Sequence, residues 1–167
     1  MKIEWIEKYL TEAEQLIFSN QVEQGMAILQ DLLFEEPGYG ELHNYLGWAY
    51  LYYCADTKKA ELHFQMAMHF DVDYHAPYLH MASLCMRTQR YAEVLVYAEK
   101  GLTKNGANVV ALYEMIGLVY ELKGEFGRAI KAYKAAATRA MATHEMNPLT
   151  DGIKRCWRKR VTFLFAF

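Results

Sequence analysis

Apolar and small side chains recur along the chain at intervals of three and four residues, which is the spacing of one face of an α-helix. From Leu112 to Tyr120 they fall at positions i, i+1, i+4, i+5 and i+8. The polar segment 123–125 interrupts this stripe, and a second stripe with the same spacing begins at Phe126. The pattern therefore predicts two amphipathic helices joined by a short turn.

This helix pair is repeated along the chain. The segments 46–50 (LGWAY) and 116–120 (IGLVY) are nearly the same phrase set 70 residues apart, and the interval divides into two units of about 35 residues. A fixed period of this length is typical of stacked copies of one supersecondary unit, each too small to bury its own apolar face alone. We therefore expect an array of helix pairs.

The unit resembles the tetratricopeptide repeat, a helix pair of about 34 residues with Leu-Gly-x-x-Tyr in its first helix and Ala, an aromatic residue and Ala in its second. Two units carry the resemblance through Ile116, Gly117, Tyr120, Ala129, Tyr133 and Ala136, and through Leu46, Gly47, Tyr50, Ala60, Phe64 and Ala67. The second of these needs one extra residue in the turn 54–58, which should only lengthen a loop. The units that begin at Ile6 and His75 are more divergent, and Pro37 stands at the closing position of the repeat.

The resemblance implies an all-α fold, a right-handed α-α superhelix of about four helix pairs. We place the repeats at approximately 6–39, 40–74, 75–109 and 110–143 in a single tetratricopeptide-like domain that spans residues 1–167.

A further helix should close the array. Asn147-Pro148 is expected to end the last repeat helix, and Thr150 or Asp151 can cap a new amphipathic helix over approximately 150–165. Its apolar stripe would cover the exposed face of the fourth unit, as terminal elements of solenoids do. About nine helices are expected in all.

In the tetratricopeptide family the first helices of successive repeats line a concave groove, so the resemblance implies which residues face a partner. These are Asn44, Tyr45, Trp48, Tyr52, His80, Met86, Arg87, Met115, Leu118 and Glu121. The set is mostly apolar and aromatic, and aromatic and Met surfaces suit an apolar or helical segment. One subclass of the family clamps a chaperone's terminal carboxylate with Lys, Asn and Arg, but the matching positions here hold Leu10, Glu14 and Tyr45.

We therefore expect a non-catalytic adaptor, assembly factor or chaperone-like binder with a protein or peptide partner. An open alternative is that the chain covers its own groove with its closing helix or with a helix over residues 5–18. The latter carries more apolar residues than one buried stripe needs, namely Trp5, Tyr9, Leu10, Ile17 and Phe18.

Charge is distributed unevenly along the chain. Residues 1–86 hold 4 Lys/Arg against 13 Asp/Glu, which gives −9, and residues 87–167 hold 14 against 7, which gives +7. Fields of opposite sign favour head-to-tail association between copies, so homo-oligomers through the ends are one expectation; unrelated solvated helix faces are the other.

The sequence contains no phosphate-binding glycine motif, and its six histidines never form His-x-x-x-His, so we expect no cofactor and no metal. With a pI of about 6.3, nucleic acid is not an expected partner. Two alternatives come from other classes. One is a membrane-peripheral accessory factor that uses the basic and aromatic segment 158–167 on an anionic membrane, and the other is an enzyme subunit with unrecognised activity.

Two features predict the compartment. The first residues lack the apolar run of a secretory signal, and no segment has the roughly 20 apolar residues that a membrane span needs. Cys54, Cys85 and Cys156 are odd in number and widely spaced, as is typical of reduced thiols. The sequence thus predicts a soluble cytoplasmic protein.

Overall fold

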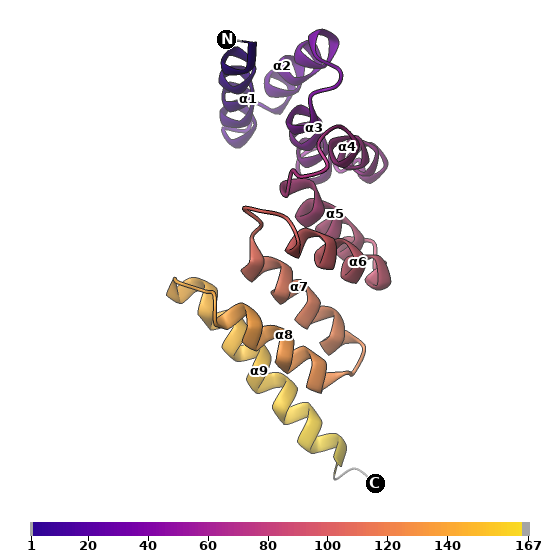
Figure 1. Cartoon of the computed structure of the whole chain (residues 1–167), viewed down its shortest axis with the longest axis vertical. Coiled ribbons are helices and arrows are strands. Elements are labelled where there is room, and N and C mark those ends of the chain that lie inside the picture. Colours follow the sequence, from indigo (N-terminus) through magenta and orange to yellow (C-terminus); the bar gives the residue numbers. More distant parts are fainter. Residues whose placement is uncertain (1, 165–167) are drawn as a thin grey trace. The chain divides into compact units, whose positions relative to one another are not determined.

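The computed structural model describes residues 2–164, with side chains over residues 4–162. Within that range the chain forms nine helices and no strand (Figure 1). Their bounds are α1 Lys2–Phe18, α2 Val22–Glu35, α3 Gly40–Tyr52, α4 Thr57–Phe70, α5 Ala76–Arg87, α6 Tyr91–Leu102, α7 Val109–Leu122, α8 Phe126–Ala137 and α9 Thr143–Leu164. The predicted all-α fold of four helix pairs and a closing helix is confirmed.

Contacts within the chain divide it into two compact units, Met1–Leu84 and Cys85–Phe167. The boundary falls inside α5, so α1 to α4 belong to the first unit and α6 to α9 to the second. Within the units, α1 packs on α2, α3 on α4, α7 on α8, and α8 on α9. A single domain over residues 1–167 remains a prediction.

A small residue lets the two helices of a repeat approach closely. A Cβ added to Gly47 would lie 2.6 Å from the ring of Phe64, and one added to Gly117 would lie 2.7 Å from the ring of Tyr133. Both rings are buried. The glycine of the Leu-Gly-x-x-Tyr motif therefore marks a packing contact, in which the second helix inserts an aromatic ring against the backbone of the first.

The turn between the two helices has the same backbone geometry in all four pairs. Asn20, Ala55, Gln89 and Gly124 have φ between 54° and 75°, in the left-handed region, and are spaced by 35, 34 and 35 residues. The next residue's amide donates to a carbonyl in the last turn of the preceding helix: Gln21 to Leu16, Arg90 to Cys85 and Glu125 to Tyr120, each at 2.8 Å, and Asp56 to Tyr50 at 3.0 Å. The bond of Asp56 spans one residue more, because the turn 53–56 holds the inserted residue.

The last helix begins earlier than the sequence predicts. α8 ends at Ala137, and α9 begins at Thr143 instead of near residue 150. The carboxylate of Glu145 accepts hydrogen bonds from the amides of Met141 and Ala142, at 3.0 and 3.2 Å. It thereby pairs amides at the helix start that have no partner inside the helix.

Two boundary predictions are consequently wrong. Asn147-Pro148 does not end a repeat helix, because Pro148 lies inside α9. Pro148 is exposed and only the sixth residue of the helix, so the amide that it lacks removes one bond near the solvated start. Thr150 and Asp151 do not cap a helix, since both lie in the interior of α9.

α9 closes the second unit by packing on α8, as predicted for the closing helix. A Cβ added to Gly152 of α9 would lie 2.9 Å from the ring of Tyr133. The Tyr133 ring is thus held between Gly117 of α7 and Gly152 of α9. Cys156 is buried in the same cluster, whereas Trp157 of the predicted apolar stripe is 48% exposed.

Candidate functional site

Five aromatic residues gather on one side of the first unit, and we call them the aromatic surface: Phe18, Tyr45, Trp48, Tyr52 and Tyr53. The ring of Trp48 lies 5.3 Å from that of Phe18, 5.0 Å from that of Tyr53 and 6.4 Å from that of Tyr45. Phe18, Tyr52 and Tyr53 are exposed, and the other two are half-buried. α3 presents Tyr45, Trp48 and Tyr52 at i, i+3 and i+7, while its Gly47 faces α4.

The aromatic surface is bordered by acidic groups. Burial raises the pKa of Tyr45 to about 12, and the charges of Glu14 on α1 and Glu41 on α3 add to this rise. A segment that lies on this surface therefore experiences a negative potential from two helices.

Two predicted groove residues of the first unit lie beneath this surface. Asn44 is 6% exposed; its Nδ2 donates to the hydroxyl of Tyr74 at 3.4 Å, and its Oδ1 has no partner among the described residues. The ring of His80 stacks on Phe64 at 5.5 Å and meets the edge of Tyr52 at 6.2 Å. Burial lowers the pKa of His80 to about 4, so it is a neutral packing residue at physiological pH.

The remaining predicted residues lie in the second unit. Met86 and Met115 are half-buried, and Arg87 and Leu118 are exposed. The side chains of Leu118 and Leu122 on α7 are both exposed. The predicted groove residues are therefore divided between the two units, and their common role in a groove remains a prediction.

Glu121, the last predicted groove residue, is 6% exposed and fully engaged within the chain. Its carboxylate accepts bonds from the guanidinium of Arg155 at 2.8 and 2.9 Å, from Lys159 Nζ at 2.8 Å and from the Tyr133 hydroxyl at 3.0 Å. The hydrogen bond from Arg155 is the largest cause that lowers the pKa of Glu121, to about 2. We call this network the Glu121 latch, because it ties α9 to α7 and α8.

The N-terminal helix forms part of the first helix pair. α1 packs mainly on α2 as the first helix of a repeat, and Leu10 and Ile17 are buried in the core of the first unit. Only its last residue, Phe18, reaches the aromatic surface. Sequence reasoning missed Phe18 and Tyr53 as members of this surface, although it had marked Phe18 as surplus to one stripe.

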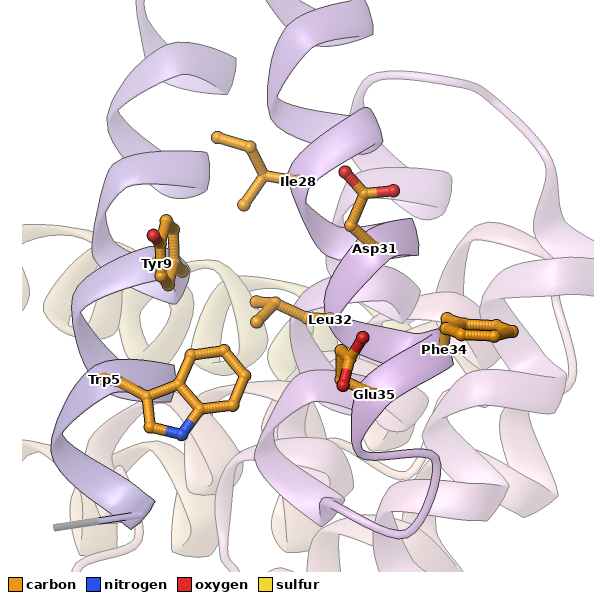
Figure 2. Close-up of a pocket in the computed structure, with 7 residues that line it drawn as sticks. All are labelled: Trp5, Tyr9, Ile28, Asp31, Leu32, Phe34 and Glu35. Carbon is orange, nitrogen blue, oxygen red and sulfur yellow. The ribbon is translucent and has the colours of Figure 1, made fainter.

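A pocket with a volume of about 420 Å³ lies between α1 and α2. Figure 2 shows Trp5 and Tyr9 of α1 facing Ile28 and Leu32 of α2 across it. Asp31 and Glu35 also line it, together with Phe34. We call it the α1/α2 pocket.

His, Cys, Asp and Glu side chains are the groups that could hold a metal ion. No group of three His, Cys, Asp or Glu side chains among residues 4–162 is placed to hold a metal ion. The closest histidine pair is structural: His43 Nε2 bonds to the carbonyl of Pro37 at 2.9 Å, and its Nδ1 bonds to Nδ1 of His63 at 3.0 Å. No helix among residues 2–164 is long and apolar enough to cross a membrane.

No family model matches the sequence, and no curated protein matches it significantly. Solved structures do resemble it. PilW, described as a widely conserved type IV pilus biogenesis factor, has a TM-score of 0.76 and 18% identity, over 92% of this chain and 74% of that one. PilF of Pseudomonas aeruginosa has a TM-score of 0.75 and 14% identity, over 93% and 75% of the two chains.

MamA of Desulfovibrio magneticus RS-1 is a third similar structure, with a TM-score of 0.70 and 15% identity over 95% of this chain and 92% of that one. PilW, PilF and MamA all contain tetratricopeptide repeats. The resemblance predicted from the repeat motif is therefore confirmed at the level of the fold, and identities this low show the fold alone.

Proposed function

We propose that this chain, which has the fold of tetratricopeptide-repeat proteins, is a non-catalytic protein-binding module. Similarity to such proteins supports an interaction or assembly role in general. The observation that carries the finer proposal is the aromatic surface, where the rings of Phe18, Tyr45 and Tyr53 meet that of Trp48, and where Phe18, Tyr52 and Tyr53 are exposed.

The partner segment that fits this surface is a helix with an apolar stripe and basic flanks. Aromatic rings supply large contact areas at small entropic cost, and Trp48 at the centre of the ring contacts is the expected hot spot. The neighbouring carboxylates Glu14 and Glu41 favour Lys and Arg at the edges of the bound segment. In this role the protein is an adaptor, an assembly factor or a chaperone-like holder of its partner.

The test uses a displayed library of amphipathic helical peptides. Peptides selected on the wild-type protein are measured by fluorescence anisotropy against Trp48→Ala and, as a control, against Leu62→Ala, which truncates an exposed residue of α4. Loss of a hot-spot Trp costs about 2 kcal/mol, or roughly thirtyfold in Kd. Equal affinity of the wild type and Trp48→Ala would remove the aromatic surface from the proposal.

Two alternatives from the sequence have their own tests. Peripheral attachment to an anionic membrane through segment 158–167, of which residues 165–167 lie outside the described part, requires the protein to float with phosphatidylserine vesicles. An enzyme subunit with unrecognised activity requires the purified protein to turn over a substrate.

We infer a cytoplasmic location from the thiols. Cys54 is exposed, Cys85 and Cys156 are buried, and all three are free. Reduced thiols are usual in that compartment. Cell fractionation with an antibody against the protein checks this inference.

We also propose that the protein self-associates. The charges of −9 on residues 1–86 and +7 on residues 87–167 are opposite in sign and attract between copies. Sedimentation at low and high salt is the direct measurement, since screening weakens such attraction.

A further inference from the structure

The α1/α2 pocket is an apolar hollow left open in the first unit. Trp5 and Tyr9 lie one turn apart on α1, and Ile28 and Leu32 lie one turn apart on α2 (Figure 2). Tyr9 remains 42% exposed. Terminal faces of solenoids are normally polar because they meet water, so an aromatic one indicates a surface that a further helix covers.

The pocket is also acidic. Asp31 and Glu35, again one turn apart, line it on the α2 side. Residues 2–36, which contain both helices, hold eight Asp/Glu and two Lys. The occupant that fits is therefore a helix with apolar and basic side chains on one face.

α9 of the second unit carries such a face. Lys154, Trp157, Arg158 and Val161 fall at i, i+3, i+4 and i+7, and so lie on one side of the helix. Trp157 is 48% and Val161 47% exposed. We call these four residues the α9 stripe.

The opposite face of α9 is engaged with its own unit, which fixes the direction of the stripe. Gly152 and Cys156 pack on the cluster around Tyr133, and Arg155 and Lys159 bind Glu121. The α9 stripe thus lies on the opposite face of the helix. Its contacts there are within α9 itself: Lys154 Nζ lies 3.6 Å from Asp151 Oδ1, and the Arg160 guanidinium lies 5.6 Å from the centre of the Trp157 ring.

The two surfaces match in both chemistry and spacing. Residues four apart on a helix have Cβ atoms about 5–6 Å apart. Each surface presents apolar groups at this spacing, Trp157 and Val161 on one side and Trp5 and Tyr9 on the other. Ile28 also lines the pocket, whereas Leu32 is buried in the core of the first unit. Each also presents its charges at this spacing, with Lys154 and Arg158 facing Asp31 and Glu35 in the matched register.

We propose that α9 of one copy docks in the α1/α2 pocket of a second copy, so that copies join head to tail. This assignment rests on the proposed self-association and names the surfaces that produce it. Because the two surfaces differ, the contact is heterologous, and each copy can bind a further copy at either surface until a ring closes. The protein should therefore form assemblies whose mass grows with concentration.

The test is a charge exchange, read by light scattering behind size exclusion at 50 and 500 mM salt. Asp31→Lys with Glu35→Lys reverses the pocket, and Lys154→Glu with Arg158→Glu reverses the stripe. Each double variant alone should weaken assembly at least about tenfold, while far-ultraviolet circular dichroism reports that the helices are intact. Matched controls are Glu12→Lys with Glu23→Lys and Lys100→Glu with Lys134→Glu, which change exposed charges outside the two surfaces and should leave assembly unchanged.

Mixing the two double variants supplies the decisive result. The unchanged stripe of the first fits the unchanged pocket of the second, and the reversed stripe fits the reversed pocket, so the mixture should recover the mass that each variant lost. A mixture that stays monomeric overturns the proposal.

Other outcomes also overturn it, in ways that separate it from the proposed function. A wild-type protein that is monomeric at 50 mM salt shows that self-association itself is absent. Assembly that both double variants retain shows that copies meet through other surfaces. Monomeric protein that floats with phosphatidylserine vesicles, and loses this on Lys154→Glu with Arg158→Glu, assigns the stripe to a membrane.

Discussion

The Glu121 latch makes a quantitative prediction about the closing helix. Glu121→Gln keeps the shape of the side chain but removes the charge that Arg155 and Lys159 bind. In the folded protein the pKa of Glu121 is lowered from 4.5 to about 2. A difference of that size corresponds to about 3 kcal/mol, because one pKa unit is about 1.4 kcal/mol. The two cationic side chains are nearly half exposed, so solvent screening reduces our expectation to about 2 kcal/mol.

The assay is urea unfolding of the wild type and Glu121→Gln at several pH values, with hydrogen exchange of the α9 amides as a local readout. A lowered pKa means that the stability is present above pH 4.5 and is lost as the pH falls from 4.5 towards 2. The variant should therefore be about 2 kcal/mol less stable at pH 7, with faster exchange in α9, and the difference should vanish near pH 2.

Glu114 on the same helix is the matched control. Burial raises the pKa of Glu114, so its charge opposes folding, and Glu114→Gln should be neutral or slightly stabilising at pH 7. The reasoning is refuted if Glu121→Gln costs less than about 0.5 kcal/mol at pH 7, or if its cost is the same at pH 7 and pH 2.

Two further predictions concern the histidines and the turns. Burial lowers the pKa of both His63 and His80 to about 4, so the unfolded chain binds more protons and stability should fall by about 3 kcal/mol for each as the pH drops from 6.5 to 4. Urea unfolding of His80→Phe should show a smaller pH slope than the wild type, and an unchanged slope would contradict the assignment. In the turns, Ala55→Gly and Gln89→Gly should each raise stability by about 0.5–1 kcal/mol, because a side chain with positive φ is strained. Thermal unfolding measures the gain, with Asn20→Gly as a control that should gain less because Asn tolerates this conformation; loss of stability in both variants would refute the argument.

Much of the fold was predictable because it depends on local sequence patterns. The four helix pairs follow from apolar spacing, and the contact of Gly47 with Phe64 recurs two repeats later as that of Gly117 with Tyr133. The start of α9 was missed because it depends on Glu145, which bonds back to the amides of the residues three and four positions earlier. From the sequence, Pro148 was expected to end a helix.

The candidate site was less predictable, because exposure depends on residues far apart in the chain. Glu121 matched a groove position, but Arg155 and Lys159, 34 and 38 residues later, engage its carboxylate. Asn44 matched another groove position, but its side chain is buried and donates to the Tyr74 hydroxyl. The helix over residues 5–18 has more apolar residues than one buried stripe needs, and one of them, Phe18, does lie in the aromatic surface.

The left-handed turn residues make the array modular in a practical sense. Gln89 and Gly124 occupy the same backbone state one period apart, so the segment 90–124 begins and ends at equivalent joints within the second unit. Duplicating residues 90–124 would place the second copy after Gly124, whose backbone conformation is that of Gln89, and would insert a whole helix pair without a new linker. The number of repeats can then be changed by adding or removing segments that end at these turn residues. The boundary of such a segment is set by the left-handed backbone conformation and not by the consensus side chains.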